Sequence, residues 1–128
     1  MPIKIEAIHK NGVCLLGSGE VNGNDLFEAN QEIYKTPEII RKYDFQLMNF
    51  LDVESLNVSY EMIEKVTAQD KNAYSINPNI KMVCVTDKEN IFNLMKMWES
   101  FVTAESFETK VVRTLEDAYS WLGIKIDA

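Results

Sequence analysis

The sequence predicts an α/β protein with a mostly parallel five-stranded sheet, an antiparallel first strand and about four helices. Segments with the two-residue period of strands alternate with segments whose apolar residues recur every three or four positions. Residues 45–53 and 82–85 are almost continuously apolar, as expected for strands that are covered on both faces. The first two strand-like segments are separated only by a short turn, which makes them antiparallel neighbours.

The predicted order is strand, strand, helix, strand, helix, strand, helix, strand, helix. Such alternation favours parallel strands joined by right-handed crossovers. A chain of 128 residues can bury enough surface for a single core, so we expect one domain over residues 1–128.

An N-terminal hairpin comes first. Residues 3–9 alternate enough to form an edge strand, and Asn11-Gly12 can supply the positive φ angles of a tight turn. Residues 13–21 form the second strand. The remaining strands are expected at residues 45–53, 82–85 and 110–113.

Each predicted helix begins at a residue whose side chain can accept a hydrogen bond from the next turn. These capping residues are Asn22, Ser59, Thr86 and Thr114. Asn22 and Thr86 are each followed three residues later by an acidic residue, which is the spacing of a capping box. Pro37 ends the first helix because it pushes its predecessor out of helical angles, and Gly123 ends the last.

The composition excludes several classes of function. Hydrophobic residues make up 46% and charged residues 26% of the chain, as in ordinary globular proteins. The formal net charge of -7 and the scattered basic residues argue against nucleic-acid binding. No apolar run approaches the roughly 20 residues of a membrane span, and the N-terminus lacks the apolar region of a signal peptide. We therefore expect a cytoplasmic protein.

The residues that commonly carry chemistry are not clustered. His9 lies at the hairpin without a nearby ligand partner, so we interpret it as a surface residue. Cys14 and Cys84 lie in apolar strand patterns, where a thiol behaves as a small buried hydrophobe. No metal or cofactor is predicted. The one enzymatic alternative uses Asp52 and Glu54 as a carboxylate pair.

The segment Gly19-Glu20-Val21-Asn22-Gly23-Asn24-Asp25-Leu26 joins a strand end to a capped helix, and Leu47-Met48-Asn49-Phe50-Leu51-Asp52 follows as the next buried strand. This arrangement resembles the STAS (sulfate transporter and anti-sigma-factor antagonist) domains, and most closely the small stand-alone bacterial SpoIIAA-like proteins. The resemblance implies strands wound in sequential order, and a non-enzymatic binding or regulatory module.

In STAS domains that act in phosphorylation switches, a serine before the helix after the third strand accepts phosphate, within Asp-Ser-Ser-Gly or a similar stretch. The matching stretch here begins at Asp52 and ends at Ser59, but it lacks the adjacent Asp-Ser pair and the glycine. Ser59 is placed as a helix cap, and this reading is preferred to a phosphorylation site.

The predicted function is the docking of a protein partner or small ligand at the loops after the second and third strands. Ligands of open parallel sheets collect beyond the carboxyl ends of the strands. The candidate residues there are Asp52, Glu54, Ser55 and Ser59.

Two further predictions concern apolar surface. A carrier of a small apolar ligand such as a lipid would use Phe27, Met95, Trp98 and Trp121. Phe92 and Met97 widen the apolar arc of the helix after Thr86, and a homodimer contact is one explanation beside packing on neighbouring helices.

Asp70 falls on an inner helix face between Val66 and Ala73. It is either a hydrogen-bonded anchor or a sign that this face turns outward.

Overall fold

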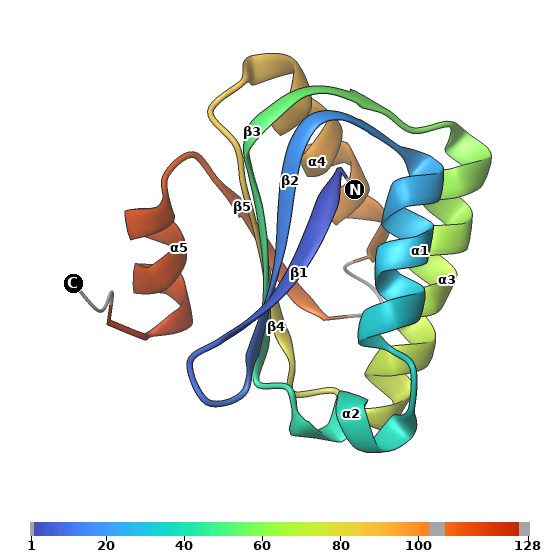
Figure 1. Ribbon diagram of the computed structural model, residues 1–128, viewed down its shortest axis with the longest axis vertical. Coiled ribbons are helices and arrows are strands. Elements are labelled where there is room, and N and C mark those ends of the chain that lie inside the picture. The colour runs from blue at the N-terminus through green and yellow to red at the C-terminus, as the bar shows by residue number, and fades with distance from the viewer. Residues whose placement is uncertain (1, 103–106, 126–128) are drawn as a thin grey trace.

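The computed structural model describes residues 2–102 and 107–125. Its strands form one sheet in the order β1-β2-β3-β4-β5, with β1 antiparallel to β2 and the other neighbours parallel (Figure 1). The strands are β1 (Ile3–Ile8), β2 (Gly12–Asn22), β3 (Phe45–Asn57), β4 (Lys81–Val85) and β5 (Glu108–Val112). The predicted fold class is confirmed.

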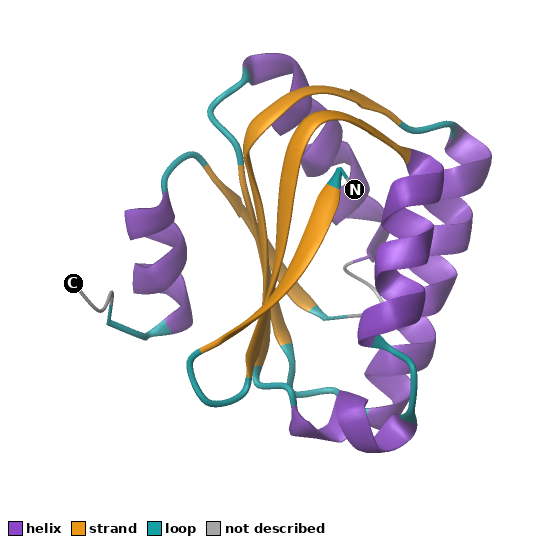
Figure 2. Ribbon diagram, viewed as in Figure 1, coloured by secondary structure: helices purple, strands orange, loops and turns teal. Residues whose placement is uncertain are grey.

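Helices cover both faces of the sheet unequally. Helices α1, α3 and α4 lie on one face, whereas α5 lies alone on the other (Figure 2). The helices are α1 (Gly23–Ile33), α2 (Pro37–Lys42), α3 (Tyr60–Ile76), α4 (Glu89–Val102) and α5 (Leu115–Leu122). Within the described ranges, none of them combines the length and hydropathy needed to cross a membrane.

The described part of the chain contains one helix more than the four predicted. Pro37 does not simply end α1, which stops at Ile33; it is the first residue of α2. Thr36 caps this helix, because its side chain accepts a hydrogen bond from the Ile39 backbone N–H at 3.2 Å. Proline is well tolerated at this position because the first turn of a helix leaves its N–H groups unpaired.

Three of the predicted caps are confirmed and one is wrong. Asn22, Ser59 and Thr114 accept hydrogen bonds from the first turns of α1, α3 and α5. Thr86 instead accepts from the Lys88 N–H at 3.3 Å, two residues along the chain, and α4 begins only at Glu89. A short local turn has thus replaced the expected capping box.

The hairpin turn also differs from the prediction. The residue with positive φ is His9, at 53°, whereas Gly12 already belongs to β2. A Cβ atom on Gly12 would lie 2.2 Å from Cζ of Phe45. Glycine is needed here because an aromatic ring packs against the backbone, and not because of the turn.

Strand β3 runs four residues further than the predicted 45–53. Only Phe45–Asn49 pair with β4, so the rest of β3 pairs with β2 alone. We call residues 18–22 of β2 and 52–57 of β3 the β2–β3 ribbon. Its register shifts beside Gly19, which has φ of 64°, and such bulges bend a strand pair. Figure 1 shows the ribbon curving toward the beginnings of α1 and α3.

A hydrophobic core fills each side of the sheet. On the side of α1, α3 and α4 the fully buried residues include Phe50, Val53 and Ile91. The α5 side has its own cluster around Ala118. Cys14 belongs to the cluster on the α5 side and Cys84 to the opposite one, and both are free and buried, as predicted.

Candidate functional site

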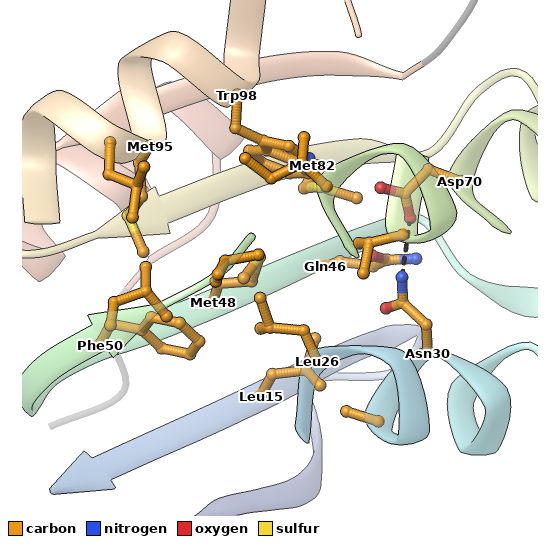
Figure 3. A pocket seen from close by; sticks show the side chains of 16 residues that line it. Leu15, Leu26, Asn30, Gln46, Met48, Phe50, Asp70, Met82, Met95 and Trp98 are labelled. Carbon is orange, nitrogen blue, oxygen red and sulfur yellow. Dashed lines mark hydrogen bonds between the residues drawn. The ribbon is translucent and has the colours of Figure 1, made fainter. Parts of the chain in front are cut away.

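An apolar cavity lies between the sheet and the three helices α1, α3 and α4. Its volume is about 50 Å³, and most of its wall is apolar (Figure 3). The apolar wall includes Leu15, Met48, Phe50, Met82, Met95 and Trp98. Leu26, Leu56 and Leu94 also line it and are only half-buried, so the cavity approaches the surface between α1, the end of β3 and α4.

Three polar side chains lie around one end of the cavity. Figure 3 shows Asn30, Gln46 and Asp70 gathered there, whereas Phe50 and Met95 lie at the other end. These three polar side chains come from α1, β3 and α3, and each is at least nine-tenths buried. The cavity therefore has the general character of a small-molecule site, apolar with a few convergent polar groups.

A chain of hydrogen bonds joins the polar side chains. Gln46 Nε2 donates to the Tyr34 hydroxyl at 2.7 Å, and that hydroxyl donates to Asp70 Oδ1 at 2.8 Å. Asn30 Nδ2 donates to the same oxygen at 3.3 Å. The carboxylate oxygen Oδ2 receives neither bond. The network ties α1, β3 and α3 together around the cavity.

Asp70 is a buried carboxyl without a cationic partner among the described ion pairs. It is only 1% exposed, and burial raises its pKa from 3.8 to about 7, although the bonds from Tyr34 and Asn30 oppose the shift. The pKa of Tyr34 is raised well above 10, mainly by burial and then by Asp70. Of the two interpretations of Asp70 from sequence, the hydrogen-bonded anchor is confirmed.

Two fully buried polar atoms of residues that line the cavity have no partner within the described structure. They are the Gln46 side-chain oxygen Oε1 and the indole Nε1 of Trp98. One is an acceptor and the other a donor. Leaving a buried polar group unpaired costs about 1–3 kcal/mol, so each of these two atoms is a local cost to the fold.

The predicted apolar residues do not come together. Met95 and Trp98 line the cavity, but Trp121 lies on the α5 side of the sheet, with its ring centroid 5.1 Å from Lys81 Nζ. Phe27 is half-buried on α1 and is not among the lining residues. Sequence reasoning missed Gln46, whose signal was an amide in an otherwise almost apolar strand.

The predicted polar candidates lie on the ribbon and just beyond it. Asp52 and Glu54 are exposed, and both belong to β3, so the prediction of a loop is wrong for them and for Ser55. The Ser55 hydroxyl is buried and has no partner within the described residues. Ser59 is exposed and caps α3, with its Oγ 3.2 Å from the Met62 N–H.

The two residues predicted for a dimer contact, Phe92 and Met97, differ in their exposure to solvent. The Arg113 guanidinium carbon lies 3.9 Å from the Phe92 ring centroid, and Arg113 is also paired with Glu89 at 2.8 Å. Phe92 is half-buried, whereas Met97 is 42% exposed. The free apolar surface on this side of α4 is therefore centred on Met97.

The described residues contain no group of three or more His, Cys, Asp or Glu side chains suited to hold a metal ion. His9 is exposed, with its ring centroid 6.1 Å from that of Phe45 and 6.2 Å from that of Tyr119. Its role in the structure is to pack at the edge of these aromatic rings.

No protein-family model matches the sequence, and no curated protein shows significant similarity to it. Solved structures do match. The anti-sigma factor antagonist SpoIIAA in its unphosphorylated form is 11% identical, with a TM-score of 0.64 over 97% of this chain and 99% of that chain. The Bacillus cell fate determinant SpoIIAA in the phosphorylated form is also 11% identical, with a TM-score of 0.61 over 94% and 98%. The chain therefore has the SpoIIAA-like fold that its sequence predicted.

Proposed function

We propose that this chain is a non-enzymatic binding module that docks a protein partner through the β2–β3 ribbon. The observation that carries the proposal is the acidic, exposed surface of the ribbon, formed by Glu20, Asp52 and Glu54. The shared fold with an anti-sigma factor antagonist supports a regulatory role. A net charge of -7 favours a partner with a basic face, since complementary charges steer association.

Charge reversal tests this proposal. The double variant Asp52→Lys/Glu54→Lys should weaken partner binding by at least about tenfold, because it removes the attraction to a basic face. The matched control is Glu32→Lys/Glu38→Lys, which changes the charge equally at exposed positions on α1 and α2, at the opposite end of the molecule in Figure 1.

The measurement has two stages. Cross-linking in cell extract, read by mass spectrometry, identifies candidate partners, and titration with the purified basic partner then measures affinity. Equal affinity for the ribbon variant and the control variant would place docking elsewhere on the molecule.

Ser59 is the better of the two serines as a site of regulation by phosphorylation. Its hydroxyl is exposed at the start of α3, whereas that of Ser55 is buried. A phosphate at a helix N-terminus gains about 0.3–1 kcal/mol from the helix dipole, but the nearby acidic residues oppose it. Incubation with cell extract and ATP, followed by mapping of phosphate by mass, tests this; modification of other residues alone would remove Ser59 from consideration.

A second candidate function is the carriage of a small, largely apolar ligand. The specific observation in its favour is the cavity between the sheet and α1, α3 and α4. Its 50 Å³ accommodate about three to four water-sized positions, so a whole lipid does not fit inside. Native mass spectrometry of the purified protein should detect a small co-purifying molecule, and a bare mass would count against this function.

The enzymatic alternative has less support. Asp52 and Glu54 are both exposed, and neither lines the cavity between the sheet and α1, α3 and α4. Acid-base catalysis by a carboxylate pair depends on a site that perturbs at least one of the two groups. We therefore prefer the binding module.

A further inference from the structure

We infer that the partner of the β2–β3 ribbon is an extended segment in which basic and apolar residues alternate, and that this segment docks by adding a strand to the free edge of β3. The inference rests on the proposed docking function of the ribbon. The backbone and the two faces of the ribbon together specify the shape and the chemistry of such a partner.

The free edge exists because β4 is shorter than β3. Strand β4 ends at Val85, which pairs with Asn49, whereas β3 continues to Asn57 beside β2 alone. In Figure 2 the ribbon continues as strand beyond the point where β4 gives way to a loop. A strand that is paired on one side only presents a row of unpaired N–H and C=O groups on its other side. Over residues 2–102 and 107–125, no hydrogen bond outside the pairing with β2 reaches the backbone of residues 52–57.

Side chains close this edge only at its beginning. Lys88 Nζ donates to the Leu51 C=O at 2.7 Å, and the Leu51 N–H donates to Asn49 Oδ1 at 3.2 Å. Lys88 Nζ also lies 3.6 Å from the Asp87 carboxylate, which offsets its charge. A lysine on an edge is a common protection against unwanted strand pairing. The part of β3 that stays open to a new strand is therefore residues 52–57.

The outer face of the open segment is acidic. Asp52 and Glu54 are exposed, whereas Val53 between them is 0% exposed. Successive side chains of a strand point to opposite faces of the sheet, so an added strand places every second side chain beside these two acids. Opposite charges on neighbouring strands stabilise their pairing. Lysine or arginine is therefore expected at alternate positions of the partner segment.

The inner face of the open segment is apolar. Val53 and Leu56 belong to the hydrophobic cluster on the side of α1, α3 and α4. Leu56 is only half-buried, and Leu94 of α4, which lines the same cavity, is half-buried as well. The remaining side chains of an added strand would lie next to Leu56 and Leu94. Covering these residues removes apolar surface from water, so apolar residues are expected at the intervening positions.

A second copy of this chain is a poor occupant of the edge. Pairing two ribbons edge to edge would bring Asp52 and Glu54 of both copies onto neighbouring strands, where like charges are destabilising. The same acids disfavour an acidic peptide or a nucleic acid. Strand addition of a basic, alternating segment satisfies the backbone and both faces together, with main-chain bonds supplying affinity and alternate side chains supplying specificity.

Three capped peptides with the same side chains test the inference. The first is alternating, Lys-Val-Lys-Val-Lys-Val. The second has the same composition in two blocks, Lys-Lys-Lys-Val-Val-Val. The third is the alternating peptide with a methyl group on every backbone nitrogen, which keeps the charge but removes the donors of a strand ladder. In isothermal titration the alternating peptide should bind, and the other two should each bind at least about tenfold more weakly.

Protein variants and hydrogen exchange locate the binding. Asp52→Asn/Glu54→Gln should weaken binding of the alternating peptide by about tenfold or more, whereas Glu32→Gln/Glu38→Gln, with the same loss of charge at exposed positions of α1 and α2, should leave it unchanged. Backbone amides within residues 52–57 should exchange at least about tenfold more slowly in the complex, because added main-chain bonds protect them. Circular dichroism establishes that each variant is folded.

The outcomes separate strand addition from the function on which it rests. Tight binding of the alternating peptide alone, with slower exchange in residues 52–57, supports both. If the block or methylated peptide binds as tightly and Asp52→Asn/Glu54→Gln weakens it, the ribbon attracts basic partners and strand addition is overturned. If the ribbon variant and the control variant bind the alternating peptide equally, both ideas fail. If no peptide binds, strand addition is overturned, and the charge-reversal experiment still judges the docking function.

Discussion

At the scale of single residues, Asp70 has the strongest physical consequence. A carboxyl with a pKa of about 7 in the fold and an ordinary value of 3.8 binds more protons in the native state than in the unfolded chain between these two values. The free energy of unfolding contributed by Asp70 must therefore fall as the pH rises through this window. The bonds from Tyr34 and Asn30 reduce this penalty without removing it.

The variant Asp70→Asn tests that consequence. As the pH rises from roughly 4 to 7, the unaltered protein should lose unfolding free energy relative to Asp70→Asn. The expected loss is up to about 1.4 kcal/mol per pH unit. Urea unfolding of both proteins at several pH values provides the measurement. Parallel pH curves for the two would show that Asp70 titrates normally in the fold.

At the scale of the elements, Ser59 is both the cap of α3 and the serine considered above as a phosphorylation site. Ser59 accepts the Met62 N–H at 3.2 Å, and loss of such a cap costs typically about 1 kcal/mol. Ser59→Ala should therefore lower the unfolding free energy by about that amount, as measured by urea denaturation. Ser59→Asn keeps a capping oxygen and should remain close to the unaltered protein. Equal losses in both variants would contradict the capping role.

Helix α5 covers its side of the sheet alone, so its packing is sensitive to size. Ala118 is fully buried there, in one cluster with Leu47 and Val83. Ala118→Leu should destabilise the protein by about 1–3 kcal/mol, because the larger side chain must displace α5 or its neighbours. Glu116→Leu, at an exposed position of the same helix, is the control and should change the unfolding free energy far less. Chemical denaturation of both variants measures the two changes in unfolding free energy.

At the scale of the whole molecule, self-association is the remaining prediction from sequence. Arg113 covers Phe92, so Met97 is the exposed part of the proposed contact and any dimer should be weak. We expect analytical ultracentrifugation to detect dimer only at high protein concentration, and Met97→Lys to abolish it. Asn93→Lys adds the same charge at another exposed position of α4. Dimer that persists in Met97→Lys would exclude this contact.

Local signals predicted much of the molecule. The caps at Asn22, Ser59 and Thr114 depend on hydrogen bonds within one turn, and short spacing in the sequence is enough to recognise them. Pro37 is predicted to end the first helix but begins α2, because proline is compatible with both positions and only the path of the chain separates the two roles.

The candidate site could be predicted only in part because its residues are distant in sequence. The bonds that join Asn30 and Tyr34 to Asp70 span 40 and 36 residues. Apolar spacing indicated that Met95 and Trp98 face inward, but it could not say which side of the sheet each helix covers. The prediction that places Trp121 with them is therefore wrong, because Trp121 lies on the opposite side.

The sequence by itself determined the α/β class, most helix starts and the buried state of both cysteines, because these follow from local periodicity and capping. The sequential strand order was implied by the resemblance to SpoIIAA-like proteins. The tertiary structure decided the rest. Right-handed crossovers between sequential parallel strands must all lie on one side, so α1, α3 and α4 enclose the cavity, whereas α5 follows the last strand and is free to cover the other side. The polar chain around Asp70 exists only because those crossovers bring α1, β3 and α3 together.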